Sequence, residues 1–433
     1  MFIDYKNFFS EIDHYIKLDT GKIVKTINFD NAATTPPFKY VLDNIKYFSS
    51  YYGSVHRGVG YKSNICSNFY EEARVAILKY FMAPSDEYTV IFTKNTTESI
   101  NKLSNRLIYN KDDVVLSSYM EHHSNDLPWR GKCNLDYIDI DKDGRLSIES
   151  LYEKLEYYNG RVKYVTLTGA SNVTGFINDI YMIAEICHNY GAEIIVDGAQ
   201  VVPHKKICIK KDNSKAVIDY LVFSAHKMYA PFGIGVIIGK KKAFDGGEPD
   251  CKGGGTVKFV TREEVVWEDV PLKEEAGTPN FMGVVALISS LKVMEYLNMD
   301  IIERHERELT RYLLYNLNKR EYISIYGSTK MDNDRLGIVS FNIKGLHHEK
   351  VAEMLYKYYG IEVRSGCFCA QPYVQRLLKI PPKEIKYYKS NLNLPKPGMV
   401  RVSFGIYNTK EEIDCFISAL DYINGRYNYF NKF

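Results

Sequence analysis

The sequence predicts a large α/β domain with a doubly wound, mostly parallel sheet, followed by a smaller C-terminal α+β domain. From about residue 88, short apolar runs alternate with helical patterns. Runs such as IIVD and VVLSS are apolar throughout, which is typical of strands that helices cover on both faces. The expected strands are 88–93, 113–118, 135–140, 162–169, 192–198, 220–226 and 233–239.

The helical patterns divide the chain. Helices are expected at 98–107 and 179–190, and Gly191 suits the C-cap of the second. A long apolar helix over 277–297 and a further helix over 301–317 place a domain boundary near residue 298. The small domain is expected to contain strands at 337–343, 361–363 and 400–404 and helices at 348–359 and from Lys410. We predict a helical segment over 1–27 that packs with the small domain, a large domain over 28–297 and a small domain over 298–433.

Composition excludes several function classes. The 56 Lys and Arg residues nearly balance 53 Asp and Glu, and the formal charge of +3 does not favour a nucleic-acid partner. No apolar run approaches the roughly 20 residues that span a bilayer, and the first residues do not resemble a signal peptide. Eight cysteines without a C-x-x-C pair, and histidines without zinc-site spacing, predict neither a disulfide framework nor a metal site. We expect a soluble cytoplasmic protein without a membrane or nucleic-acid partner.

Two strand ends carry ionisable residues of opposite charge. Asp197 ends the run IIVD, and Lys227 follows the run YLVFSAH. Ligands of open α/β sheets bind at the C-terminal ends of strands, where partial desolvation makes a lysine nucleophilic enough to form a Schiff base. The aspartate would balance the charge of a pyridinium nitrogen, so the pair predicts a pyridoxal phosphate site. The alternative is a surface lysine and a turn-forming aspartate.

A phosphate cradle is predicted beside this pair. The polar turn KNTTESIN opens a helix, and a helix N-terminus offers free amides and a favourable dipole to an anion. Thr96 and Thr97 add hydroxyls, and Ser224 and His226 flank the lysine. The alternative for the two threonines is an ordinary helix cap with an acidic first turn.

Four further segments belong to the same set of motifs: EHHSNDLPW (121–129), SNVTG (171–175), GGG (253–255) and EAGTPN (275–280). Together they resemble the class V aminotransferase family of fold-type I pyridoxal phosphate enzymes, and within it the group II (SUF-type) cysteine desulfurases and selenocysteine lyases. The resemblance runs from about Asn28 to Tyr407. It implies that Lys227 carries the cofactor as a Schiff base and moves the α-proton, and that Asp197 pairs with the pyridinium nitrogen. It also implies that Gln200 bonds to the phenolic oxygen, and that His122, rather than His123, stacks on the ring.

The resemblance further implies how the phosphate and the substrate are held. The phosphate would bind Thr97, Ser224, His226 and the amide of Thr96, with Thr278 of a second subunit completing the site of a homodimer; the alternative for Thr278 is a helix cap. Arg401, in VRVSFGIYN, resembles the arginine that binds the substrate carboxylate, and its planar fork suits bidentate pairing. Secondary candidates around the substrate are Arg364, Asn172 and His56. A surface ion pair is the alternative for Arg364.

The segment VRSGCFCAQP (363–372) resembles the desulfurase loop, in which the persulfide-forming cysteine precedes a small residue, and this implies Cys369 as the nucleophile. Cys367 stands where the family commonly has histidine. Since residues two apart in an extended chain share a face, Cys367 could resolve a persulfide, form a strained bridge or simply fill space. The short loop and the GGGTVKF segment (253–259) resemble group II enzymes, which implies a sulfur-acceptor protein.

The Pro- and Lys-rich segment 380–398 is expected to be an irregular insertion that serves as a lid, as an acceptor surface or only structurally. The expected function is a pyridoxal phosphate-dependent cysteine desulfurase that converts L-cysteine to L-alanine and holds the sulfur on Cys369, with iron–sulfur cluster assembly among the pathways it could supply. The alternatives are a selenocysteine lyase, another aminotransferase, epimerase or C–S lyase of the class, and a silent scaffold. The complete set of Lys227, Asp197 and His122 argues against the scaffold.

Overall fold

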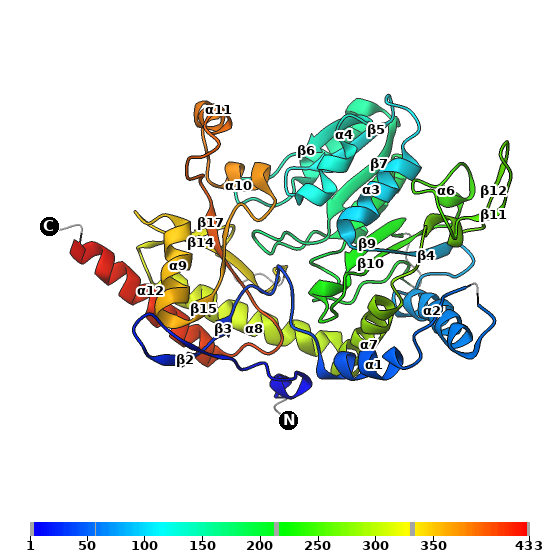
Figure 1. The fold of residues 1–433 in the computed structure, drawn as a ribbon. Helices are drawn as coiled ribbons and strands as arrows, with labels where there is room; N and C mark the ends of the chain where they lie inside the picture. Colours follow the sequence, from blue (N-terminus) through cyan, green and yellow to red (C-terminus); the bar gives the residue numbers. More distant parts are fainter. Residues whose placement is uncertain (1–3, 57, 212–215, 330–333, 431–433) are drawn as a thin grey trace.

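The computed structural model describes residues 4–56, 58–211, 216–329 and 334–430. The large domain is built on a seven-strand sheet in the order β4-β10-β9-β8-β7-β5-β6 (Figure 1). Its strands are β4 (Tyr88–Thr93), β5 (Val114–Ser118), β6 (Asn134–Ile138), β7 (Val162–Thr168), β8 (Glu193–Asp197), β9 (Tyr220–Ser224) and β10 (Gly235–Lys240). Strand β10 runs antiparallel to both of its neighbours, β4 and β9, and the other strand pairs described in this sheet are parallel. The predicted fold, a mostly parallel α/β sheet with a smaller domain after it, is confirmed.

Both faces of this sheet are covered, which explains why its strands are apolar throughout. Along β4, Ile91 packs with α3 (Thr96–Leu107) and α6 (Lys242–Asp245). Its neighbours Val90 and Phe92 belong to the larger core on the other face. That core is built with α1 (Lys39–Ser49), α2 (Tyr61–Tyr80), α4 (Ile148–Tyr158), α5 (Ile180–Asn189) and α7 (Phe281–Leu297). A two-stranded hairpin, β11 (Val257–Val260) with β12 (Val265–Trp267), extends from the edge of the domain (Figure 1).

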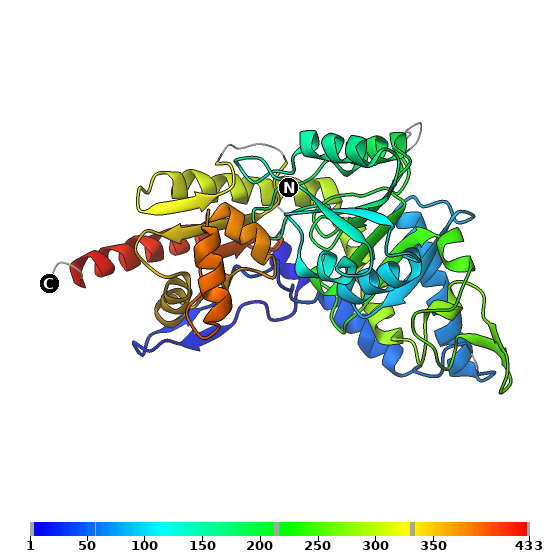
Figure 2. The same cartoon turned by 90° about the horizontal axis from the view of Figure 1, so that it is seen from above.

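The small domain has a four-strand antiparallel sheet in the order β13-β14-β17-β16, seen beside the large domain in Figure 2. The strands are β13 (Ile323–Tyr326), β14 (Ile338–Ile343), β16 (Arg364–Gly366) and β17 (Met399–Ser403), packed with α8 (Met299–Asn318), α9 (His348–Tyr359) and α12 (Lys410–Phe430). The boundary near residue 298 stays a prediction. The position of α8 agrees with this boundary, because the start of the helix packs in the large core through Ile302 and its middle packs in the small core through Leu309.

No single helix in the described ranges is long and apolar enough to cross a membrane. Helices α7 and α8 reach that length and composition only as a pair, which is bent by 77° at its break.

The prediction of a helical segment over 1–27 is wrong for the part that the structure describes. It contains one 3-10 turn, η1 (Tyr5–Phe8), and a hairpin of β1 (Tyr15–Lys17) and β2 (Ile23–Lys25). The next strand, β3 (Ile27–Asn28), pairs in parallel with β15 (Ile361–Glu362) of the small domain. Ile16 and Val24 lie against Gly360, so packing on the end of α9 favours the hairpin over a solitary helix.

The segment 380–398 is also more regular than predicted. It contains α11 (Pro382–Ser390), which follows α10 (Gln371–Leu377), and each helix has a proline in its first turn, where a missing amide costs nothing. No residue of α11 is buried, and the helix stands away from the body of the protein at the top of Figure 1. The end of the segment is tied down, because Asn342 Nδ2 donates to the carbonyl of Gly398 at 2.9 Å.

Candidate active site

A cavity of about 600 Å³ lies where the C-terminal ends of β8 and β9 meet the small-domain segment that begins with β16. The sheet topology brings these ends together, as expected for an open α/β fold. The predicted residues that line the cavity are Thr96, Thr97, His122, Asn172, Asp197, Gln200, Ser224, His226, Lys227, Arg364, Cys369 and Arg401.

Asp197 and Lys227 form the charged centre of the cavity. Asp197 ends β8 and is buried, and its Oδ1 accepts from the amide of Ala199 at 2.9 Å. Burial raises the pKa of Asp197, while the amide of Ala199 and the charge of Lys227 oppose the rise. Burial lowers the pKa of Lys227 to about 8, an effect reinforced by Arg401 and opposed by Asp197 and Cys369. The amine therefore loses its proton near pH 8, well below the usual range of a lysine, which favours a nucleophilic lysine.

The N-terminus of α3 forms the anion cradle. Thr96 and Thr97 are its first two residues, and the helix places their amides and dipole toward the cavity. The Thr96 amide donates to Ser224 Oγ at 2.8 Å, so this amide bonds to a protein hydroxyl rather than standing free as predicted. The Thr97 hydroxyl lies 2.6 Å from Ser124 Oγ, a residue of the cradle to which the sequence analysis assigned no role. His226, whose pKa burial and Lys227 lower to about 4, completes the wall as a neutral ring.

His122 is held as a neutral imidazole. Its Nδ1 accepts from the amide of Ser124 at 3.0 Å, which leaves the ring proton on Nε2. Burial first, then the charges of Lys227, His123 and Arg401, lowers the pKa of His122 to about 3. Its neighbour His123 points elsewhere, since its Nε2 accepts from the amide of Gln371 at 3.2 Å.

Arg401 lies in β17 with its side chain buried in the cavity wall. Its Nη2 lies 3.1 Å from Asp30 Oδ1, and its Nη1 donates to the Asn172 carbonyl at 2.9 Å. Its buried Nε has no hydrogen-bond partner among the residues that the structure describes. Arg364 is half-exposed and pairs with the other oxygen of Asp30 at 3.1 Å. Burial lowers the pKa of Arg401 to about 10, with Asp30 opposing. Asp30, which the sequence analysis missed, thus joins the two predicted arginines.

Cys369 lies in a tight turn that enters the cavity wall. The Ala370 amide donates to the Cys367 carbonyl at 2.9 Å, and the two central residues, Phe368 and Cys369, have positive φ of 53° and 54°. Consecutive positive φ values define a type I′ turn. Asn172 Nδ2 donates to the Phe368 carbonyl at 2.7 Å, and the His123 amide donates to the Cys369 carbonyl at 2.6 Å. The exposed thiol of Cys369 is therefore carried on backbone that two outside residues hold in place.

Two predicted site residues lie outside this cavity. His56 is paired through Nε2 with Glu71 at 2.7 Å, and Thr278 is an exposed residue before α7. Within one chain, therefore, neither reaches the substrate or phosphate position that the resemblance implies.

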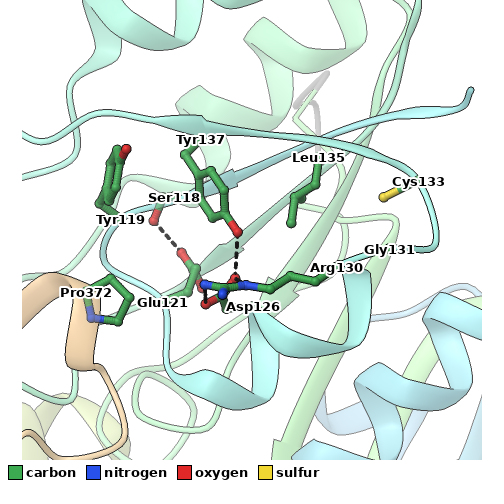
Figure 3. A pocket seen from close by; sticks show the side chains of 10 residues that line it. All are labelled: Ser118, Tyr119, Glu121, Asp126, Arg130, Gly131, Cys133, Leu135, Tyr137 and Pro372. Atoms are coloured by element: carbon green, nitrogen blue, oxygen red, sulfur yellow. Dashed lines mark hydrogen bonds and ion pairs between the residues drawn. The ribbon is translucent and has the colours of Figure 1, made fainter. Parts of the chain in front are cut away.

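A second cavity, of about 450 Å³, borders the loop that carries His122 (Figure 3). Its notable residue is Glu121, a buried carboxylate that accepts from Ser118 Oγ, Asn125 Nδ2 and the Thr168 amide. Burial raises the pKa of Glu121 to about 8 although these donors oppose the rise. Thr168 also lines the first cavity, so Glu121 connects the His122 loop to the sheet edge beside Asp197. No pattern in the sequence pointed to a role for Glu121.

The residues present fit a pyridoxal phosphate group. The helix N-terminus with its hydroxyls suits a phosphate, the buried carboxylate suits a pyridinium nitrogen, and the low-pKa lysine suits the aldehyde carbon. Fold and site together define an enzyme of the pyridoxal phosphate-dependent class with fold type I.

The chain belongs to the aminotransferase class-V family, because the family model matches residues 27–416. A relative from Halalkalibacterium halodurans, described as a probable cysteine desulfurase, is 36% identical over 404 residues, which covers 91% of this chain and 92% of the relative. A cysteine desulfurase of Haloferax volcanii is 32% identical and covers 91% and 88%. The solved structure of the apo cysteine desulfurase of Thermococcus onnurineus NA1 is similar with a TM-score of 0.81 at 32% identity, covering 92% of this chain and 95% of that one.

Proposed function

We propose that this protein is a pyridoxal phosphate-dependent cysteine desulfurase that converts L-cysteine to L-alanine and retains the sulfur as a persulfide on Cys369. The observation that carries the proposal is the position of Cys369. Its thiol lies in the wall of the cavity that holds Lys227 and Arg401, near enough to raise the pKa of both cations electrostatically. A nucleophilic cysteine in this position serves desulfuration and has no role in transamination.

Each residue then has a defined task. When bound, pyridoxal phosphate supplies an electron sink next to the α-carbon of the amino acid. Arg401 binds the substrate carboxylate, using the unpartnered Nε, and Lys227 takes and returns protons at the substrate carbon because its pKa lies near neutrality. His122 would face the ring of the bound cofactor as a neutral imidazole, and Asp197 and Gln200 would hold the cofactor in position.

The sulfur step balances without an added oxidant. The Cys369 thiolate attacks the sulfur of the substrate, the substrate C–S bond breaks as the S–S bond forms, and the carbon receives a proton to yield alanine. Arg401 and Lys227 line the same cavity as Cys369 and place two basic side chains beside the reacting sulfur atoms.

We further propose a homodimer and a sulfur-acceptor protein. The exposed position of Thr278, outside its own cavity, supports a role in the site of a second subunit, and the same arrangement is proposed for His56. The exposed thiol of Cys369 supports transfer of sulfur to an outside acceptor. A cytoplasmic location remains a prediction.

The test is an absorbance spectrum of the purified protein before and after L-cysteine is added, with alanine and sulfide quantified in the same tube. We expect a yellow protein whose band changes on addition and which forms alanine. Cys369→Ala should keep the colour and lose alanine formation, whereas Cys415→Ala, which removes another exposed thiol that does not line the cavity, should keep both. A yellow protein that forms no alanine refutes desulfuration, and faster turnover of L-selenocysteine would favour a lyase of that substrate.

A further inference from the structure

A second thiol shares the cavity wall with the proposed nucleophile. Cys367 and Cys369 both line the cavity, and Cys367 is partly exposed there. The proposed desulfuration uses only Cys369, so the chemistry open to Cys367 is unassigned. Both sulfurs are free in the structure, as are all the cysteines of the chain.

The turn holds these two cysteines close together. They are its first and third residues, and the turn is closed by the bond from the Ala370 amide to the Cys367 carbonyl. Because the chain reverses direction there, Cα atoms two residues apart are separated by less than the roughly 7 Å of an extended chain, a spacing that disulfides bridge. The bonds from Asn172 and His123 hold the carbonyls of Phe368 and Cys369 from outside, so the backbone of the turn keeps the two cysteines at this short spacing.

Resting on the proposed function, we propose that Cys367 is a resolving cysteine: its thiolate attacks the Sγ of the Cys369 persulfide, expels hydrosulfide and closes a Cys367–Cys369 disulfide. The Sγ–Sγ bond forms as the bond from Cys369 Sγ to the outer sulfur breaks. Cys367 and Cys369 end as a disulfide, the outer sulfur is reduced to sulfide, and the proton of the Cys367 thiol leaves with it. A small dithiol reductant, or a protein dithiol of the same class, then restores both thiols for the next turnover.

The chemistry of the persulfide favours this step. Hydrosulfide is a good leaving group, since exchange is faster when the departing sulfur has a low pKa. The attack is intramolecular and competes well with acceptors that must diffuse to the site. The product is free sulfide, so this chain would supply a reaction that consumes sulfide itself, in addition to or instead of a persulfide carrier.

The experiment is a single turnover of the holoenzyme with one equivalent of L-cysteine, under anaerobic conditions and with no other thiol present. Alanine and sulfide are quantified, free thiols are then blocked with an alkylating reagent, and the peptide containing both cysteines is analysed by mass spectrometry. In the wild-type protein we expect about one sulfide per alanine and a peptide that has lost two hydrogens and carries no alkyl group. In Cys367→Ser we expect the ratio of sulfide to alanine to fall at least about tenfold, with one extra sulfur retained on Cys369.

Cys415→Ser is the matched control and should behave as wild type, because Cys415 is exposed but does not line the cavity. The ratio of sulfide to alanine is independent of the turnover rate, so a slow variant can still be compared with the wild type. If Cys367→Ser does not fold, the mass of the wild-type peptide tests by itself whether the disulfide forms. Alanine formed with a persulfide that persists in the wild type would overturn the resolving role. An extra sulfur found on Cys367 would also overturn it, because Cys367 would then accept sulfur from Cys369 instead of forming a disulfide with it. Absence of alanine from the yellow wild-type protein would instead be a failure of the desulfurase proposal.

Discussion

Asn172 is expected to control the reactivity of Cys369 without touching its sulfur. Its Nδ2 donates to the Phe368 carbonyl at 2.7 Å, and both residues are buried. The bond holds a turn whose two central residues have positive φ, a conformation that costs about 1–2 kcal/mol for each residue other than glycine. In Asn172→Ala the turn keeps this cost and loses one of its two outside anchors.

The magnitude follows from the lost bond. A buried carbonyl left without its donor costs about 1–3 kcal/mol, which corresponds to a fall of about 5- to 150-fold in the population of the ordered turn and hence in the rate of persulfide formation. The rate of persulfide formation is measured by rapid quenching and mass spectrometry. The absorbance change on adding L-cysteine should be retained, because it reports substrate binding rather than sulfur transfer.

Asn342→Ala is the matched control. Asn342 Nδ2 donates to the Gly398 carbonyl at 2.9 Å, an equivalent amide-to-carbonyl bond that does not involve the cavity lining. This variant should lose stability to urea without slowing the sulfur step. The reasoning is refuted if Asn172→Ala forms persulfide at the wild-type rate, or if both variants slow it equally.

Three further predictions concern charge. The pKa of Lys227 is lowered to about 8, and only its neutral amine attacks the aldehyde of the cofactor. The rate of cofactor uptake by the apoenzyme should therefore rise about tenfold per pH unit below pH 8 and level off above it. A rate that continues to rise to pH ~10 would contradict this pKa. Burial raises the pKa of Glu121 in the folded state to about 8, so ionisation of Glu121 disfavours the folded state. The stability of the protein to urea should therefore fall as the pH rises from about 4.5 to 8. In Glu121→Gln the stability should fall less over this pH range. Asp30→Asn leaves buried Arg401 without its counter-charge and should lower the stability of the protein in urea by about 1–3 kcal/mol. The loss is smaller than for a fully buried ion pair because Asp30 is partly exposed. Unchanged stability would refute the role of the Asp30–Arg401 pair.

Local sequence patterns predicted much of the large domain because each of its strands and helices is defined by a short run of adjacent residues. Each of the seven predicted sheet strands corresponds to an observed one, since burial on both faces leaves an uninterrupted apolar run. Helices α1 and α2 were not predicted. Neither begins with a side chain that caps its first amides, so the usual start signal is missing. The N-terminal hairpin and α11 were missed for a different reason, because packing and a first-turn proline, rather than apolar periodicity, define them.

The residue types of the site were also readable in the sequence. Asp197, Lys227, Thr96, Thr97 and Ser224 lie within a few residues of a strand end or a helix start, so their convergence follows from the rule that strand ends of an open sheet share one edge.

What only the tertiary structure decided is the set of contacts between distant parts of the chain. Asp30 joins Arg401 across 371 positions, and Asn172 anchors the Cys369 turn across 196. The neutral state of His122 and the raised pKa of Glu121 depend on burial by other segments. Local patterns report backbone preference and the period of burial, whereas hydrogen-bond partners and desolvation are fixed only when the two domains enclose the cavity.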